Sequence, residues 1–267
     1  MGKRPLFRQK TLKIQSMESS NRRSAPRFFV PEPMSVGARL DLGERASRHI
    51  TVLRLREGDS ITLFNGDGGE HAAVLTLISR GRCAARITGR FDVDRESPLD
   101  ITLAQCLSSS DRMDITLQKA TELGVLTIQP LESERSVVRL SGDRVEKRMT
   151  HWRNIVFAAC EQCGRNLPPT VGTLDRLQAW LIACPPKSAA ELRLLLLPDA
   201  TTGLASLALS KKITLLVGPE GGLAPHEQGA ALNAGFTPIR LGPRTLRTET
   251  APLAAVAALQ TLWGDLG

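Results

Sequence analysis

The chain has 267 residues, 42% hydrophobic and 23% charged, which is enough for one large globular domain or two ordinary ones. No apolar run approaches the roughly 18 residues that a membrane-spanning helix needs, so we expect a soluble protein. The net charge of +8 is uneven, because residues 1–24 hold seven Lys and Arg but one acidic residue. Aromatic residues make up only 4%, which argues against a protein that grips RNA mainly by base stacking.

Residues 1–24 form a basic leader with two interpretations. The leader either touches RNA phosphates without sequence preference or is a disordered segment with no role. It lacks the roughly 7–15-residue apolar core of a secretion signal, and Met17 is an alternative start. Five cysteines, an odd number, in a chain without a secretion signal favour reduced thiols and a cytoplasmic location.

The part of the chain from Arg27 to about Asp94 has the pattern of short β-strands. Strands are predicted over 60–64, 70–78 and 83–91, and a turn rich in Gly, Asn and Asp separates the first two. Several short strands joined by tight turns predict a small barrel or sandwich over residues 25–95. Residues 96–100, which include Pro98, are interpreted as a linker.

Residues 101–267 are expected to form a second domain in which strands and helices alternate. Apolar runs predict strands over 101–107, 125–131, 192–197, 213–217 and 237–241, and helical periodicity predicts helices over 111–123, 143–164, 225–234 and 250–262. Such alternation is typical of an α/β fold with a mostly parallel sheet covered on both faces. The alanine-rich last helix weakly favours close packing in a dimer, although alanine is also the best helix former.

Three of these predicted strands end in loops of unusual composition. The loops are Leu197-Pro198-Asp199, 217–223 (VGPEGGL) and 241–250 (LGPRTLRTET). Ligands of open α/β sheets bind outside the carboxyl ends of the strands, and Gly and Pro let the main chain approach an adenine or ribose closely. The alternative is tight-turn chemistry alone. The expected ligand-binding residues are Leu197, Pro198, Val217, Gly218, Pro219, Glu220, Gly221, Gly222, Leu241, Gly242 and Leu246.

Other familiar site patterns do not match. Neither glycine-rich loop has the spacing of a P-loop or of a dinucleotide-binding fingerprint. Cys160 and Cys163 lack a second ligand pair for zinc, so we interpret them as buried thiols in a helix. No metal site is expected.

Five motifs in fixed order give the chain a closer resemblance. They are 27–29 (RFF), 118–125 (QKATELGV), 161–165 (EQCGR), 216–223 (LVGPEGGL) and 241–251 (LGPRTLRTETA). This ordered set, which spans the chain from about Arg27 to its end, closely resembles the RsmE family of 16S rRNA methyltransferases in the SPOUT superfamily.

The resemblance implies an N-terminal PUA-like β-barrel that binds RNA and a C-terminal α/β domain with a deep trefoil knot. It also implies a homodimer that uses S-adenosylmethionine at the knotted loops. The implied reaction is methylation of N3 of a uridine in the assembled small ribosomal subunit, conventionally uridine 1498 of 16S rRNA. Two rival functions stay open: a non-catalytic RNA-binding assembly factor and a SPOUT methyltransferase that acts on another RNA.

Methyl transfer to N3 of uracil requires loss of the N3 proton and alignment of the base with the methyl group. We expect Arg165 and Arg247 to stabilise the developing uridine anion, and Glu161 or Glu249 to accept the proton. Glu161 and Arg165 are four residues apart, so an ion pair on one helical face is an equal alternative. Glu249 lies where the last helix begins, so helix capping is the alternative for it.

Four cations are the candidates for RNA contact. They are Arg27, Arg112, Lys119 and Arg165. The alternative for Arg112 and Lys119, which share a predicted helix face with Glu122, is an ordinary solvated surface.

Overall fold

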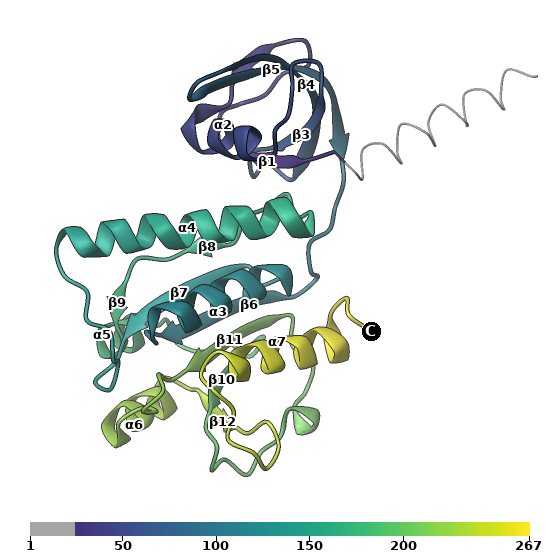
Figure 1. The fold of residues 1–267 in the computed structure, drawn as a ribbon. Helices are drawn as coiled ribbons and strands as arrows, with labels where there is room; N and C mark the ends of the chain where they lie inside the picture. The colour runs from purple at the N-terminus through teal and green to yellow at the C-terminus, as the bar shows by residue number, and fades with distance from the viewer. Residues whose placement is uncertain (1–24) are drawn as a thin grey trace, which may run out of the picture. The chain divides into compact units, whose positions relative to one another are not determined.

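The computed structural model describes residues 25–267, so the predictions for the basic leader and Met17 lie outside the described residues. Within 25–267, no helix is both long enough and apolar enough to cross a membrane. The chain divides into two compact units (Figure 1). The first comprises residues up to Arg95 together with Gly164–Leu167, and the second comprises Glu96–Cys163 and Pro168–Gly267. The sequence prediction placed residues 164–167 in the second domain, because no local pattern marks four residues that pack with a distant segment.

The first unit is a mixed five-stranded sheet with one helix. Its strands are β1 (Arg27–Phe29), β2 (Arg39–Asp41), β3 (Ser60–Phe64), β4 (Gly69–Ser79) and β5 (Arg82–Asp92). They pair in the order β1-β3-β4-β5-β2, with β1 parallel to β3 and the other neighbours antiparallel. The sheet curves around its own core of buried apolar residues, among them Phe28, Leu63 and Leu75 (Figure 1).

The expectation of β structure throughout this region was wrong for one segment. Residues Gly43–Val52 form helix α2, in which Ala46 and Ile50 are fully buried and lie four residues apart. Leu42, which is also buried, lies four residues before Ala46, so the three apolar residues share one helical face. This spacing is a sequence signal for the helix that the prediction of short strands overlooked.

The second unit is a parallel sheet covered by helices. Its strands are β6 (Asp100–Cys106), β7 (Thr127–Glu132), β8 (Thr170–Val171), β9 (Asp175–Arg176), β10 (Glu191–Leu196), β11 (Lys212–Val217) and β12 (Thr237–Ile239). The order is β12-β10-β11-β6-β7-β8, β9 also pairs with β7, and every pair is parallel. The predicted α/β class is confirmed, while β8 and β9 are too short to leave a periodic signal.

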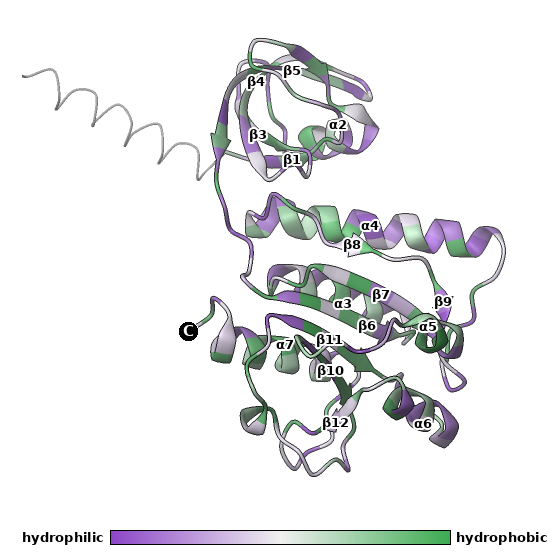
Figure 2. Ribbon diagram, turned by 180° about the vertical axis from the view of Figure 1, so that it is seen from behind, coloured by the Kyte–Doolittle hydropathy of each residue, from purple (hydrophilic) through white to green (hydrophobic). Residues whose placement is uncertain are grey.

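Helices cover both faces of this sheet. They are α3 (Ser110–Glu122), α4 (Asp143–Cys163), α5 (Leu177–Ala183), α6 (Pro225–Asn233) and α7 (Thr250–Trp263), and Leu204–Ser206 form a short 3-10 turn, η1. The core with α3, α4 and α7 contains Leu215 of β11, and the core with α5 and α6 contains the next residue, Leu216. Adjacent strand residues thus enter opposite cores, which explains the unbroken apolar runs in the sequence. Figure 2 shows these central strands as largely hydrophobic.

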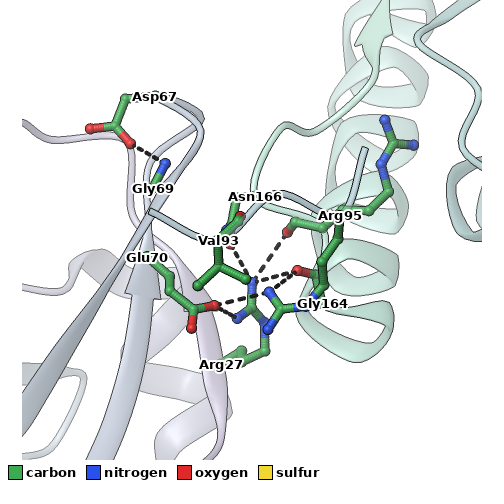
Figure 3. Close-up of polar contacts among 9 residues, drawn as sticks. Arg27, Asp67, Gly69, Glu70, Val93, Arg95, Gly164 and Asn166 are labelled. Carbon is green, nitrogen blue, oxygen red and sulfur yellow. Dashed lines mark hydrogen bonds and ion pairs between the residues drawn. The ribbon is translucent and has the colours of Figure 1, made fainter. Parts of the chain in front are cut away.

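A clasp of charged groups fixes residues 164–166 within the first unit (Figure 3). The Arg27 guanidinium donates to Glu70 Oε2 at 2.7 Å, and to the main-chain oxygens of Gly164 and Arg165 at 3.1 and 3.2 Å. It also donates to Asn166 Oδ1 at 2.7 Å. Arg95 donates to the same Glu70 oxygen and to the Gly164 oxygen. We name these six residues the Arg27 clasp.

Gly124, which ends α3, generates a prediction about the second unit. Its φ is +81°, and an added Cβ would lie 2.8 Å from Gln260 Nε2, whose amide donates to the Leu123 oxygen. Gly142 also has a positive φ, +55°, but has open space around it. We expect Gly142→Ala to lower the free energy of unfolding by about 1 kcal/mol through backbone strain alone, and Gly124→Ala by roughly 3 kcal/mol. Urea unfolding followed by tryptophan fluorescence measures both; equal losses would contradict the close contact.

The clasp generates a second prediction. Burial by itself would raise the pKa of Glu70, but hydrogen bonds from Arg27 and Arg95 outweigh burial and hold that pKa below its usual value. Glu70 therefore stabilises the unit above the pKa it has in the unfolded chain, and this stabilisation is lost as the pH falls through the lowered folded pKa. We expect Glu70→Gln to cost about 3 kcal/mol at pH 7 and progressively less below about pH 4.

Hydrogen exchange of the β4 and β5 amides measures this loss in the first unit alone. Glu44→Gln is the matched control, because the Glu44–Arg48 ion pair is exposed and its removal costs under about 1 kcal/mol. A loss of protection in Glu70→Gln no larger than that of the control would show that the clasp does not stabilise the unit.

Candidate functional site

The loops that follow β10, β11 and β12 line one pocket of about 610 Å³ in the second unit. The carboxyl ends of parallel strands meet at one edge of a sheet, so the strand order itself gathers these loops. The volume lies within the range of small-molecule sites. All eleven predicted ligand-binding residues line this pocket: Leu197, Pro198, Val217, Gly218, Pro219, Glu220, Gly221, Gly222, Leu241, Gly242 and Leu246.

Two glycines shape the pocket walls. Gly222 and Gly242 have φ of +66° and +78°, a conformation that favours glycine over residues with a side chain. The Gly222 N–H donates to the Pro219 oxygen at 2.9 Å, which closes the turn after β11. Because glycine has no side chain, main-chain atoms are exposed to the pocket at these two positions.

A buried threonine ties two of the loops together. The Thr248 hydroxyl donates to the Gly218 oxygen at 2.9 Å, and Gln105 Nε2 lies 3.4 Å from the same hydroxyl. Thr248 is 8% exposed and Gln105 is fully buried at the carboxyl end of β6. Sequence reasoning missed Gln105, although a polar residue within an apolar strand run was a signal for it.

Glu220 is held by the protein as an ionised carboxylate. It accepts the Ser109 N–H at 3.0 Å and Arg112 at 2.9 Å. Burial would raise the pKa of Glu220, but main-chain N–H groups and Arg112 outweigh burial and lower that pKa. In addition, Arg112 Nε lies 3.5 Å from Glu249 Oε2. Arg112 thus holds two loops of the pocket together. Neither of the two interpretations from the sequence, RNA contact or a solvated helix face, included this role.

The predicted catalytic residues differ in their relation to the pocket. Arg247 lines it and is exposed. Glu249 occupies the N-cap position of α7, but its side chain makes no capping hydrogen bond. Glu161, buried in the last turn of α4, is not among the lining residues, and the buried Arg165 belongs to the other compact unit.

Two of the predicted RNA contacts are also engaged within the chain. The side chain of Arg27 is 13% exposed, and both its terminal nitrogens donate within the Arg27 clasp (Figure 3). Arg27 thus holds residues 164–166, and its contact with RNA stays a prediction. Lys119 Nζ lies 2.8 Å from Glu122 Oε1, an ion pair between positions i and i+3 on α3.

The pocket walls also include residues that sequence reasoning did not single out. Among them are Arg135, Asp199, Arg240 and Arg244. Arg244 lies in the 241–250 loop that the sequence analysis predicts to bind a ligand. Arg135 follows β7, far from the three loops in the sequence, and only the fold brings it to the pocket. Over residues 25–267 no cluster of three or more His, Cys, Asp or Glu is arranged to hold a metal ion. Neither Cys160 nor Cys163 forms a disulfide bond, and Cys160 is buried.

Family models match both units of the chain. A model described as RNA methyltransferase domain matches residues 95–260, and one described as RNA methyltransferase PUA domain matches residues 42–88. The chain is 34% identical over 243 residues to "Ribosomal RNA small subunit methyltransferase E" of Buchnera aphidicola subsp. Schizaphis graminum, covering 90% of this chain and 98% of that protein. It is 33% identical to the protein of that name from Mycobacterium tuberculosis, covering 82% and 85%.

Solved structures agree with these matches. A ribosomal RNA small subunit methyltransferase E from Neisseria gonorrhoeae, bound to S-adenosyl methionine, has a TM-score of 0.83 and 46% identity, covering 91% of this chain and 100% of that one. A putative methyltransferase from Legionella pneumophila in complex with the same cofactor has a TM-score of 0.86 and 37% identity, covering 91% and 99%. The two-unit fold, the pocket at the strand ends and these matches lead to one conclusion: the chain belongs to the ribosomal RNA small subunit methyltransferase E family, RsmE, within the SPOUT methyltransferases.

Proposed function

We propose that this chain transfers a methyl group from S-adenosylmethionine to N3 of a uridine in 16S rRNA of the assembled small subunit, at position 1498. The coarser activity, an S-adenosylmethionine-dependent rRNA methyltransferase of the small subunit, is that of its family. The finer proposal rests on one pocket formed by three loops, two of which, 217–223 and 241–250, lie within the motifs that the chain shares with the family. The homodimer and the trefoil knot stay predictions from the resemblance, and the cytoplasmic location stays a prediction from the cysteines and the lack of a secretion signal.

The pocket fits the cofactor. Its main-chain walls at Gly218, Gly222 and Gly242 offer N–H and C=O groups to an adenosyl group, and apolar side chains such as Leu197 and Leu246 line it as well. When bound, S-adenosylmethionine supplies the methyl group on a sulfonium, which makes that group electrophilic. The residues of the chain then have to orient the base, lower the free-energy cost of removing its N3 proton and exclude water from the site.

Arg247 is the residue best placed to serve the base. It lines the pocket, so its guanidinium has access to the negative charge that develops on the uracil. Glu249, two residues later, is our candidate to accept the N3 proton, with Arg112 beside it to stabilise the carboxylate. Glu249 is itself absent from the lining residues but follows the lining residue Thr248 in the chain, whereas Glu161 and Arg165 have no lining residue next to them in the sequence. A catalytic role for Glu161 or Arg165 stays a prediction.

Methyl mapping tests the proposed function. Purified protein is incubated with labelled S-adenosylmethionine and small subunits that lack the modification, and the methylated nucleotide is located by primer extension. We expect label at uridine 1498, no label on already modified subunits, and a fall of at least 100-fold in kcat for Arg247→Ala. Calorimetry that detects no binding of S-adenosylmethionine would favour the non-catalytic assembly factor, and label on another RNA would favour the other methyltransferase.

The tie between Thr248 and Gly218 yields a prediction about cofactor affinity. Thr248→Val keeps the side-chain shape but leaves the Gly218 oxygen without its donor, so the loop after β11 loses its fixed position. We expect the Kd for S-adenosylmethionine to rise roughly three- to tenfold, measured by calorimetry. Thr261→Val removes an exposed hydroxyl contact near the C-terminal end of α7, the helix that follows Thr248, and is the control that is expected to leave Kd unchanged. Equal Kd values for both variants would refute the role of the tie.

A further inference from the structure

The walls of the pocket carry more positive charge than the cofactor needs. Five lining residues are arginines and two are carboxylates; the arginines are Arg112, Arg135, Arg240, Arg244 and Arg247, and the carboxylates are Asp199 and Glu220. S-adenosylmethionine brings a sulfonium, an ammonium and one carboxylate, so it is itself a net cation. An arginine-rich wall therefore does not complement the cofactor, except at its single carboxylate.

The arginines divide into two groups by their contacts. Arg112 is paired with Glu220 and Glu249, and Arg135 donates to the Gly221 oxygen at 3.2 Å. Arg240, Arg244 and Arg247 are exposed, and their side chains make no hydrogen bond or ion pair with other residues in the 25–267 range. Three guanidinium groups thus lie on one short loop with their donors open to a ligand.

The loop that carries them is anchored at both ends. The Arg240 N–H donates to the Thr202 oxygen at 2.9 Å and residue 240 bridges Gly203, while the Arg247 oxygen accepts the N–H groups of Thr250 and Ala251 where α7 begins. Anchored ends restrict where the side chains between them can reach. This distinguishes the loop from a mobile basic tail, whose charges have no fixed relation to the pocket.

We propose that Arg240 and Arg244 bind phosphate groups of the substrate RNA at the mouth of the pocket, on either side of the nucleotide whose base enters it. The planar guanidinium fork matches the geometry of phosphate oxygens, and phosphate contacts position a nucleic acid without reading its sequence. Arg247 keeps its proposed role of stabilising the negative charge that develops on the uracil. This inference rests on the proposed function and names two residues that determine how the substrate is held.

A salt titration of the kinetics tests the inference. Arg240→Ala and Arg244→Ala are compared with the native protein in KM for unmodified small subunits, over a range of KCl at constant Mg²⁺. Each lost phosphate contact releases one fewer counterion, so the slope of log(1/KM) against log[KCl] is expected to become shallower by about 0.7–0.9 per variant. KM for the subunits rises about tenfold at low salt, while kcat and the Kd for S-adenosylmethionine stay unchanged.

A matched control removes the same charge elsewhere in the second unit. Lys211 is exposed and immediately precedes β11, at the end of the strand opposite the pocket, so Lys211→Ala is expected to keep the native slope and KM. A native slope in both arginine variants would overturn the inference. So would a raised Kd for S-adenosylmethionine with unchanged KM for the subunits, because that result assigns the arginine to the cofactor carboxylate.

The native protein in the same experiment separates this inference from the proposed function. If it neither binds S-adenosylmethionine nor methylates the subunits, the proposed function fails. If it does both and the two arginine variants behave like it, only the phosphate contacts fail.

Discussion

Parallel pairing of β10 with β11 and with β12 is the constraint on which the rest of the structure depends. Leu195 of β10 pairs with Leu216 of β11, and Leu196 pairs with Ile239 of β12, so these strands end within a residue or two of one another. Three loops separated by about twenty residues each along the chain thereby share one edge of the sheet. An antiparallel neighbour would send its following loop to the opposite edge, and the pocket would lose a wall.

The same arrangement separates two kinds of interaction within one site. Gly218, Gly222 and Gly242 present main-chain groups, which suit a cofactor that must be recognised by shape and hydrogen bonds. The arginines of the 240–247 loop present exposed positive charge, which suits a polyanion. Glu220 and Arg112, which both line the pocket, neutralise each other, so this guanidinium presents no uncompensated charge to a cationic cofactor.

Local sequence patterns predicted the helices and strands that are long and periodic. They failed where the position of a residue depends on contacts between distant segments of the chain. The apolar runs at 213–217 and 192–197 located the central strands to within a residue, because buried parallel strands need apolar side chains on both faces. Within the pocket, glycine and proline marked the loops. Arg135 has no such signal, and the only signal for Gln105 is its polarity within an apolar strand; the position of both residues follows from the pairing of β6 and β7 with the rest of the sheet. Helix α2 was missed for another reason: its flanking strands dominated the pattern.

The position of an arginine in the sequence does not reveal whether its charge pairs within the protein or stays available to a ligand. Two arginines of this chain illustrate the difference. Arg27 and Arg244 both stand in motifs shared with the RsmE family, and neither has an acidic neighbour within two residues. In the fold Arg27 meets Glu70, 43 residues away, and is held over the Phe64 ring at 5.0 Å. Arg244 meets no carboxylate in the described chain and stays exposed at a pocket. An arginine whose two terminal nitrogens already donate within the protein has little to offer a phosphate, so the distribution of carboxylates determines which cations remain for RNA.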